Sequence, residues 1–197
     1  MRRIEQQLNF IIEIDKLKTI LRQTLLCDQS RRENSAEHSW HLAVMAMLLG
    51  EYSDGAVDTA HTMKMVLVHD IVEVDAGDVF AYDEAANNGK EDRERAAADR
   101  IFGLLPTEQA RDLRALWDEF EARETTESKF ANALDRLQPL LHNSQTEGGT
   151  WRIHSVRRDQ VLRRMDPVRI GIPEVWPVVM KIVDDACERG WIKSEKL

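Results

Sequence analysis

The sequence is poor in cysteine and has no long hydrophobic run. Only Cys27 and Cys187 are present among 197 residues, and they form no CxxC pair. This scarcity excludes a disulfide scaffold or zinc ribbon and favours a reducing compartment. No stretch approaches the roughly 20 apolar residues of a membrane span. The charged start of the chain, MRRIEQQLNF, also argues against a signal peptide. We therefore expect a cytoplasmic protein that does not associate with membranes.

Positive charge is also scarce relative to negative charge. The chain has 27 Lys and Arg residues against 35 Asp and Glu residues, so its formal net charge is −8 at pH 7. Such a surface repels a phosphate backbone and argues against a large nucleic-acid partner. A small anionic substrate remains compatible with it, because one divalent ion and one or two arginines can make a locally positive pocket.

Apolar residues recur with helical spacing over most of the chain, and no alternating pattern is long enough to define a strand. We therefore predict an all-α fold, a helical bundle forming a single domain over residues 1–197. Asp58 and Ser35 are the predicted N-caps of two helices. The predicted loops cover residues 27–35, 75–90 and 143–151. The predicted helices include residues 4–25, 36–52, 91–105, 107–122, 127–142, 155–168 and 174–189.

Within the stretch VLVHDIVEVDAGD (residues 66–78), His69 and Asp70 interrupt an apolar segment. Adjacent helical residues point about 100° apart, so both side chains can reach one ion beside the helix. Glu73 follows one turn later on the same face. The alternative is a hydrogen-bonded core histidine next to an aspartate at a helix end, but a charge at the end of an apolar run needs a partner.

The segments SAEHSWH and NALDRLQ carry further candidate ligands. His38 lies in the first turn of its helix, where it is either a ligand or a capping or surface residue. His41, one turn later, either shares a metal with His38 or supports the site from behind. Asp135 belongs to a small and polar helical stripe that also contains Gln138 and His142.

That stripe can face a cavity, and Pro139 leaves the backbone carbonyl of Asp135 without its usual helical partner. The alternative for Asp135 is an ordinary salt bridge, for instance to Arg136. Two imidazoles and two carboxylates together make a donor set that suits Mn²⁺, Fe²⁺, Co²⁺, Ni²⁺ or Zn²⁺, and Mg²⁺ less well. Water on such an ion can act as a nucleophile near neutral pH.

The order of these residues, His38, then His69-Asp70, then Asp135, resembles that of the HD-domain metal-dependent phosphohydrolases. ENSAEHSWHLAVMA and HDIVEVDAGD resemble the small 5′-deoxynucleotidase group within that family, and the similarity covers about residues 17–142. It implies an all-helical fold with C-terminal helices (150–190) packing on the motif region, usually as a homodimer. It also implies one divalent metal in the helical core and removal of phosphate from deoxynucleoside 5′-monophosphates.

The resemblance also implies roles for individual residues. His38, His69, Asp70 and Asp135 would bind the metal. Glu73 would orient or deprotonate the attacking water, and it should stay ionised because the metal charge opposes a rise in its pKa. Asp78 would contact the sugar, and Arg22 would hold the phosphate.

The sequence departs from this group at two places. Gln23 stands where an aromatic residue is expected, and Phe80 and Tyr82 lie in a loop that usually carries a proline. The two aromatics either stack on a base or pin the loop onto the core.

Two alternative functions remain open at this point. One is an HD hydrolase of another phosphorylated metabolite, although Val74 follows Glu73 where the alarmone hydrolases carry an aspartate. The other is a non-catalytic helical protein that uses a metal to stabilise its fold. A cluster of arginines from Arg157 to Arg164 is either a solvated face, a partner surface or an anion site.

Overall fold

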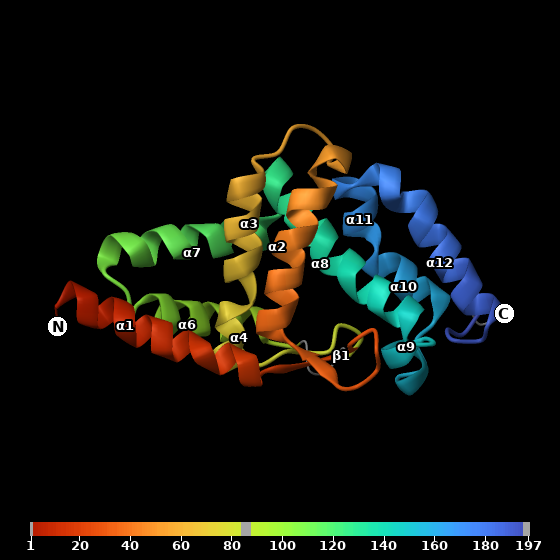
Figure 1. Cartoon of the computed structure of the whole chain (residues 1–197), viewed down its shortest axis with the longest axis horizontal. Coiled ribbons are helices and arrows are strands. Elements are labelled where there is room, and N and C mark those ends of the chain that lie inside the picture. Colours follow the sequence, from red (N-terminus) through yellow and green to blue (C-terminus); the bar gives the residue numbers. More distant parts are fainter. Residues whose placement is uncertain (1, 84–87, 195–197) are drawn as a thin grey trace.

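A computed structural model describes residues 2–83 and 88–194 of the chain. Helices dominate this structure, which confirms the predicted all-α class. Three helices lie together in the middle of the molecule (Figure 1): α2 (Ser35–Leu49), α3 (Thr59–Val68) and α8 (Thr126–Gln145). Among the described residues, no helix has both the length and the apolar character needed to cross a membrane.

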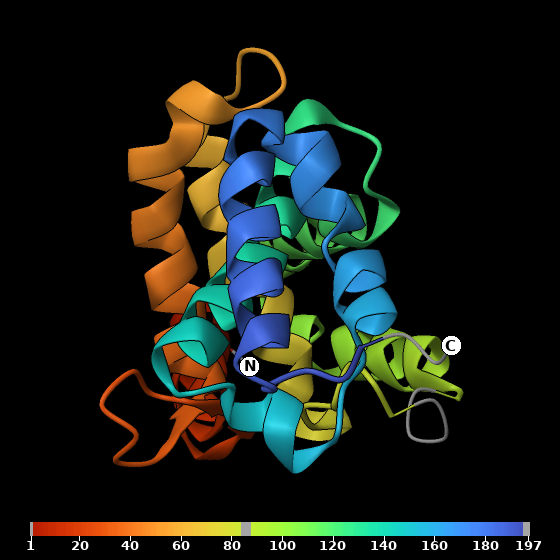
Figure 2. The same ribbon diagram turned by 90° about the vertical axis from the view of Figure 1, so that its right-hand side faces the viewer.

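The remaining helices cover the two ends of this central group (Figures 1 and 2). One end carries α1 (Arg3–Ile14), α4 (Glu73–Ala76), α6 (Lys90–Phe102) and α7 (Thr107–Ala122). The other carries α9 (Gly149–Ile153), α10 (Arg158–Arg164), α11 (Asp166–Gly171) and α12 (Trp176–Glu188). Short 3₁₀ segments join some of them: η1 (Asp15–Thr19), η2 (Gly50–Tyr52), η3 (His69–Val72) and η4 (Pro173–Val175).

The hydrophobic core has two clusters, and α3 contributes to both. Met65 and Val66 of α3 pack with Phe130 of α8 in the larger cluster. Val68, at the end of α3, packs with Ile101 of α6 in the smaller cluster. The turn that follows Val68 therefore begins where the two clusters meet along α3, and this is the turn that carries His69 and Asp70.

The prediction of one helix over residues 4–25 is wrong at its C-terminal end. Helix α1 stops at Ile14, and the chain then forms η1 and a strand, β1 (Leu21–Leu25). This strand pairs in antiparallel fashion with β2 (Arg32–Asn34), inside the segment predicted as a loop. The buried residues of β1 are Arg22 and Thr24. Because the buried side of this strand is polar, the sequence does not show the alternation of apolar and polar residues from which a strand is predicted.

Several helix boundaries also differ from the prediction. Asn34, rather than Ser35, caps α2, because its side chain accepts a hydrogen bond from the backbone N–H of Glu37. Asp58 caps α3 as predicted. The segment predicted as a loop at 143–151 contains the end of α8 and the start of α9, and the helix predicted at 155–168 is two helices, α10 and α11. Residues 84–87 of the predicted loop at 75–90 lie outside the described residues.

Gly171 lets α11 approach α8 closely, and we expect Gly171→Ala to destabilise the fold. A Cβ at this position would lie 2.5 Å from the carbonyl oxygen of Lys129 and 2.9 Å from the Cβ of Ala133. Because backbone must shift to relieve this contact, unfolding in urea should show a loss of about 1–3 kcal/mol. Gly50→Ala is the matched control, since its nearest neighbour would lie at 3.4 Å. An unchanged urea midpoint for Gly171→Ala would contradict this account of the packing.

Candidate metal centre

His69 and Asp70 lie in η3, where α3 tightens into a 3₁₀ turn. The Nδ1 atom of His69 lies 2.8 Å from the carbonyl oxygen of Val66, so Nδ1 carries a proton and Nε2 is the nitrogen available to a metal ion. That Nε2 atom lies 3.0 Å from Oδ1 of Asp70. Both side chains therefore point into the same buried space, as the adjacent pair predicted.

His38 reaches the same space from the first turn of α2. Its side chain is fully buried, and its Nε2 atom lies 2.9 Å from Oδ1 of Asp135. Its Nδ1 atom lies 3.2 Å from Oε1 of Gln138, an acceptor, so Nδ1 carries a proton, and Nε2 faces Asp135 through either a proton or a metal ion. The helix start that places His38 is secured by the reciprocal capping contacts between Asn34 and Glu37.

Asp135 joins the group from the middle of α8, and its two oxygens have different partners. Oδ1 lies 2.9 Å from Nε2 of His38 and 3.9 Å from Nε2 of His69. Oδ2 accepts a hydrogen bond from Arg136. The alternative interpretation, a salt bridge to Arg136, is therefore correct for one oxygen, while the other oxygen faces the histidines.

The nitrogen and oxygen atoms of these side chains are better satisfied by a bound cation than by contacts with one another. The ligand atoms of His38, His69 and Asp135 lie within 4.8 Å of one another, and all three side chains are buried. Nε2 of His69 has no hydrogen-bond partner among the described residues. Two imidazole lone pairs facing carboxylate oxygens repel unless a proton or a metal ion lies between them. The structure thus brings the four predicted ligands together, and their binding of metal remains a prediction.

Arg22 extends from β1 over the same group. Its Nη1 atom donates to Oδ2 of Asp70 at 2.9 Å and lies 3.8 Å from Oδ1 of Asp78. Burial acts against the charge on Arg22, but Asp70 and Asp78 outweigh it and raise its pKa. Burial likewise opposes the ionisation of Asp70, yet His69 and Arg22 hold the pKa of that carboxyl below its usual range.

Glu73 lies at the start of α4 and is buried beside the group. Its Oε2 atom accepts a hydrogen bond of 2.5 Å from the hydroxyl of Ser35. Burial, and then the charge of Asp70, raise the pKa of Glu73 well above its usual value, while Arg22 and the Ser35 contact act in the opposite direction. Burial also raises the pKa of Asp78, against the effect of Arg22. The prediction that Glu73 stays ionised therefore depends on a cation that offsets Asp70.

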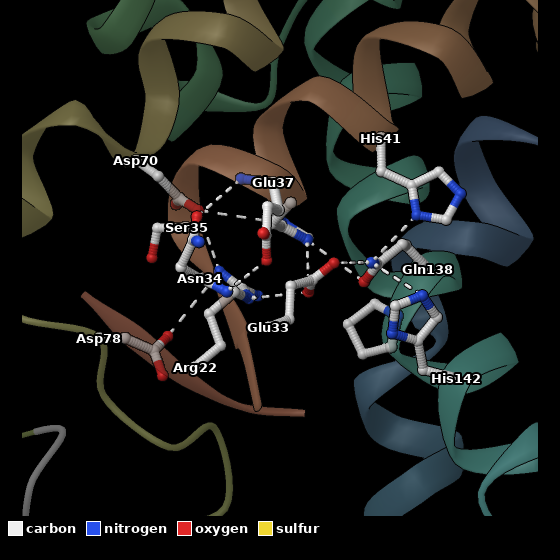
Figure 3. Close-up of polar contacts among 12 residues, drawn as sticks. Arg22, Glu33, Asn34, Ser35, Glu37, His41, Asp70, Asp78, Gln138 and His142 are labelled. Atoms are coloured by element: carbon white, nitrogen blue, oxygen red, sulfur yellow. Dashed lines mark hydrogen bonds and ion pairs between the residues drawn. The ribbon is translucent and has the colours of Figure 1, made fainter. Parts of the chain in front are cut away.

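His41 does not lie with His38. Figure 3 shows it next to Gln138 and His142, away from Asp70. The Nε2 amide of Gln138 lies 3.4 Å from Nδ1 of His41, 3.2 Å from Nε2 of His142 and 2.6 Å from Oε1 of Glu33. Gln138 thus connects the back of His38 to a second buried polar group, in which Glu33, His41 and His142 also bring possible ligand atoms within 4.8 Å.

His38, His69, Asp70 and Asp135 are called the metal-ligand group below, after their predicted role. A cavity opens beside this group and encloses about 580 Å³, including the part open to solvent. Its walls include Arg22, Asp78, Tyr82, Arg136, Trp151 and Arg164. Phe80 and Tyr82 lie 5.3 Å apart between ring centroids, and both rings pack against the larger core cluster. They therefore pin their loop onto the core and also face the cavity, so neither of the two interpretations of these aromatics excludes the other.

The comparisons with known proteins agree with this geometry. A family profile described as HD domain matches residues 14–176. The chain belongs to the HD domain family. A crystal structure described as a predicted metal-dependent phosphohydrolase from Magnetospirillum magnetotacticum MS-1 superimposes on this HD-domain protein with a TM-score of 0.92. The two are 56% identical, and the match covers 96% of this chain and 95% of that one.

Two curated relatives carry a narrower name. The human protein 5′-deoxynucleotidase HDDC2 is 30% identical over 141 residues, which cover 71% of this chain and 68% of that protein. A 5′-deoxynucleotidase from Pectobacterium atrosepticum is 25% identical over 167 residues, covering 80% and 83% respectively. This HD-domain protein is a hydrolase of the metal-dependent phosphohydrolase type, which confirms the resemblance found in its sequence.

Three residues at the site of this HD-domain protein had no predicted role there. Glu33 lay in a segment predicted as a loop, yet it is 2% exposed and contacts Gln138. Ser35 was predicted only as a helix cap, and it instead bonds Glu73. Arg164 was assigned only to a cluster with three possible roles, and it lines the cavity. None of the three is an apolar residue of a periodic stripe, so the sequence pattern gave no signal of its place in the fold.

Proposed function

We propose that the chain removes phosphate from deoxynucleoside 5′-monophosphates, using one divalent ion held by His38, His69, Asp70 and Asp135. The observation that carries this proposal is the convergence of the Nε2 atoms of His38 and His69 on Oδ1 of Asp135. The guanidinium of Arg22 lies directly beside that group and lines the cavity. A cation centre next to an arginine-lined cavity is suited to a phosphate ester.

A bound divalent ion supplies a Lewis acid and lowers the pKa of coordinated water. The chain's own residues do the rest in this proposal. Glu73, held by the Ser35 hydroxyl, takes the proton from the attacking water or orients that water. Arg22 donates its free N–H groups to the phosphate oxygens and stabilises the charge that develops on them. The products are the deoxynucleoside and inorganic phosphate.

Asp78 is the proposed sugar contact in this scheme. Its carboxylate lies 3.8 Å from Arg22 and borders the cavity, so a sugar attached to a phosphate at Arg22 comes within its reach. Tyr82 and Trp151 provide aromatic surface in the same cavity, on which a base can stack. Gln23, the departure from the related enzymes, also lines this cavity and places an amide near the sugar and base.

The test is phosphate release from matched deoxy- and ribonucleoside 5′-monophosphates after metal stripping and re-addition of Mn²⁺, Co²⁺, Mg²⁺ or Zn²⁺. We expect release that depends on the added metal and is faster for the deoxy substrates. Equal rates for both sugars would contradict the proposed sugar preference. Turnover of other phosphate esters, with none from any nucleoside monophosphate, would point instead to a different phosphorylated metabolite.

Gln138 contacts Nδ1 of His38, the ring nitrogen that does not face Asp135. We expect Gln138→Leu to weaken metal binding by about 10- to 100-fold. The substitution removes the acceptor that fixes the tautomer of His38 and leaves Glu33 without its hydrogen bond. Isothermal titration of Mn²⁺ into the metal-free protein measures the effect. Gln145→Leu, at the exposed end of the same helix, is the control and should bind like the wild type. Equal affinity in both variants would contradict a supporting role for Gln138.

We also propose that the protein forms a homodimer. Two helices expose apolar residues that a monomer would leave in water: Ile4, Leu8, Ile11 and Ile12 on α1, and Trp40, Met47 and Leu48 on α2. The spacing on α1 predicted an apolar helical face, and the structure leaves that face exposed. A second copy of the chain that buried such a face would gain hydrophobic stabilisation. Light scattering across a range of protein concentrations tests this expectation.

A further inference from the structure

The cavity beside the metal-ligand group is more positive than a single phosphate requires. Its charged lining residues are three arginines, Arg22, Arg136 and Arg164, and one carboxylate, Asp78. This concentration of positive charge occurs on a chain whose formal net charge is −8. Like charges do not gather in a partly enclosed space without a cost, which an anionic ligand would offset.

Two of these arginines already have partners. Arg22 pairs with Asp70 at 2.9 Å, and Arg136 bonds Oδ2 of Asp135. Arg164 differs from them: across residues 2–83 and 88–194, its guanidinium forms no hydrogen bond or ion pair. Its side chain is nonetheless half-buried, in contrast to its exposed neighbour Arg163.

The positive charge of Arg164 is only partly balanced by its surroundings. Burial, followed by the positive charge of Arg136, lowers the pKa of Arg164 to about 9, although Asp135 and Tyr82 act in the opposite direction. Arg164 lies on α10, whereas Arg22 lies on β1 and Arg136 lies on α8. Three separate parts of the chain therefore converge on one cavity with guanidinium groups.

We propose that Arg164, together with Arg136, forms a second anion site that binds a further phosphate group of the substrate. The inference rests on the proposed function, because it places the hydrolysed phosphate at Arg22 and the second phosphate at Arg164 and Arg136, which line the same cavity. The substrate class is then a deoxynucleoside 5′-phosphate that carries another phosphate on the same sugar. A guanidinium fork matches two phosphate oxygens, and it keeps its charge at neutral pH even with a lowered pKa.

The two anion positions are close enough for one small molecule. Nη2 of Arg22 lies 3.9 Å from Oδ1 of Asp135, while Arg136 bonds the other oxygen of the same carboxylate. Arg22 and Arg136 thus lie on either side of one carboxylate group, and Arg164 lines the same cavity as both of them. Two phosphates on a single sugar can therefore reach both anion positions within one cavity.

The test compares deoxynucleoside 3′,5′-bisphosphates with the matching 5′-monophosphates for the four common bases, in the metal-loaded full-length protein. We expect kcat/KM for 5′-phosphate release to be at least about 10-fold higher for the bisphosphate, chiefly through a lower KM, because a charged hydrogen-bonded pair is gained. Arg164→Gln should reduce this ratio by about 10-fold or more. Arg163→Gln, on the exposed side of the same helix, should leave the ratio unchanged.

A ratio near one in the wild type, or an equal loss on both substrates in Arg164→Gln, would overturn the second anion site. Binding to the Glu73→Gln variant makes the test independent of turnover: the bisphosphate should bind more tightly, and adding Arg164→Gln should abolish the difference. Tighter bisphosphate binding without release from any monophosphate would support the anion site and contradict the proposed function. Release from monophosphates without a bisphosphate preference would support the proposed function and contradict the second anion site.

Discussion

We expect His69→Ala to lose the bound metal and to lower kcat/KM for phosphate release by at least about 10³-fold, because the Lewis acid supplies several kcal/mol of stabilisation. Nε2 of His69 is buried, has no hydrogen-bond partner among the described residues and lies 3.9 Å from Oδ1 of Asp135, so this substitution takes one nitrogen from the proposed ligand set. Metal content by mass spectrometry and phosphate release measure the two effects.

His61→Ala is the matched control for His69→Ala. His61 lies in the first turn of α3, at the opposite end of the helix from His69, and its Nε2 atom pairs with Glu119 at 2.7 Å. We expect this variant to keep both its metal and its activity. Normal metal content in His69→Ala would remove His69 from the proposed ligand set.

The second large effect is expected for Glu73→Gln, which should lower kcat by about 10²- to 10⁴-fold while the metal stays bound. The amide keeps the size of the side chain and its contact with Ser35, but it cannot accept the proton of the attacking water. Phosphate release under saturating substrate measures kcat, and metal content is determined on the same sample.

Asp75→Asn, on the same short helix, is the control for Glu73→Gln. Asp75 pairs with Arg100 near the surface, and its side chain is 35% exposed. It should therefore change kcat little, since it does not reach the metal-ligand group. Full activity of Glu73→Gln would exclude this residue as the general base.

The metal-ligand group could be predicted from the sequence because its residues interrupt helices in a recognisable way. His69 and Asp70 follow an apolar run, and Asp135 lies on a polar stripe beside a core stripe. In both places a charged residue lies at a position that the helical pattern predicts to be buried, and a buried charge requires a partner. The structure brings His69 and Asp135 together with His38, and Asp70 lies 3.0 Å from Nε2 of His69.

The surroundings of that group could not be predicted in the same way. Arg22 and Thr24 face inward from a strand whose buried side is polar, so hydrophobic alternation did not reveal it. Gln138 was predicted to lie on the polar stripe with Asp135, but it is fully buried, and its contact with Glu33 depends on a strand pairing that the sequence did not indicate. The single-domain organisation over residues 1–197 remains a prediction.

The most direct test of the account is a titration of metal-free protein with Mn²⁺, following phosphate release from a deoxynucleoside 5′-monophosphate. The account predicts no release before metal is added and a rise that ends at one equivalent of metal per chain. His38→Ala and Asp135→Asn should each abolish the rise. Phosphate release that is unaffected by complete metal removal would contradict the central claim.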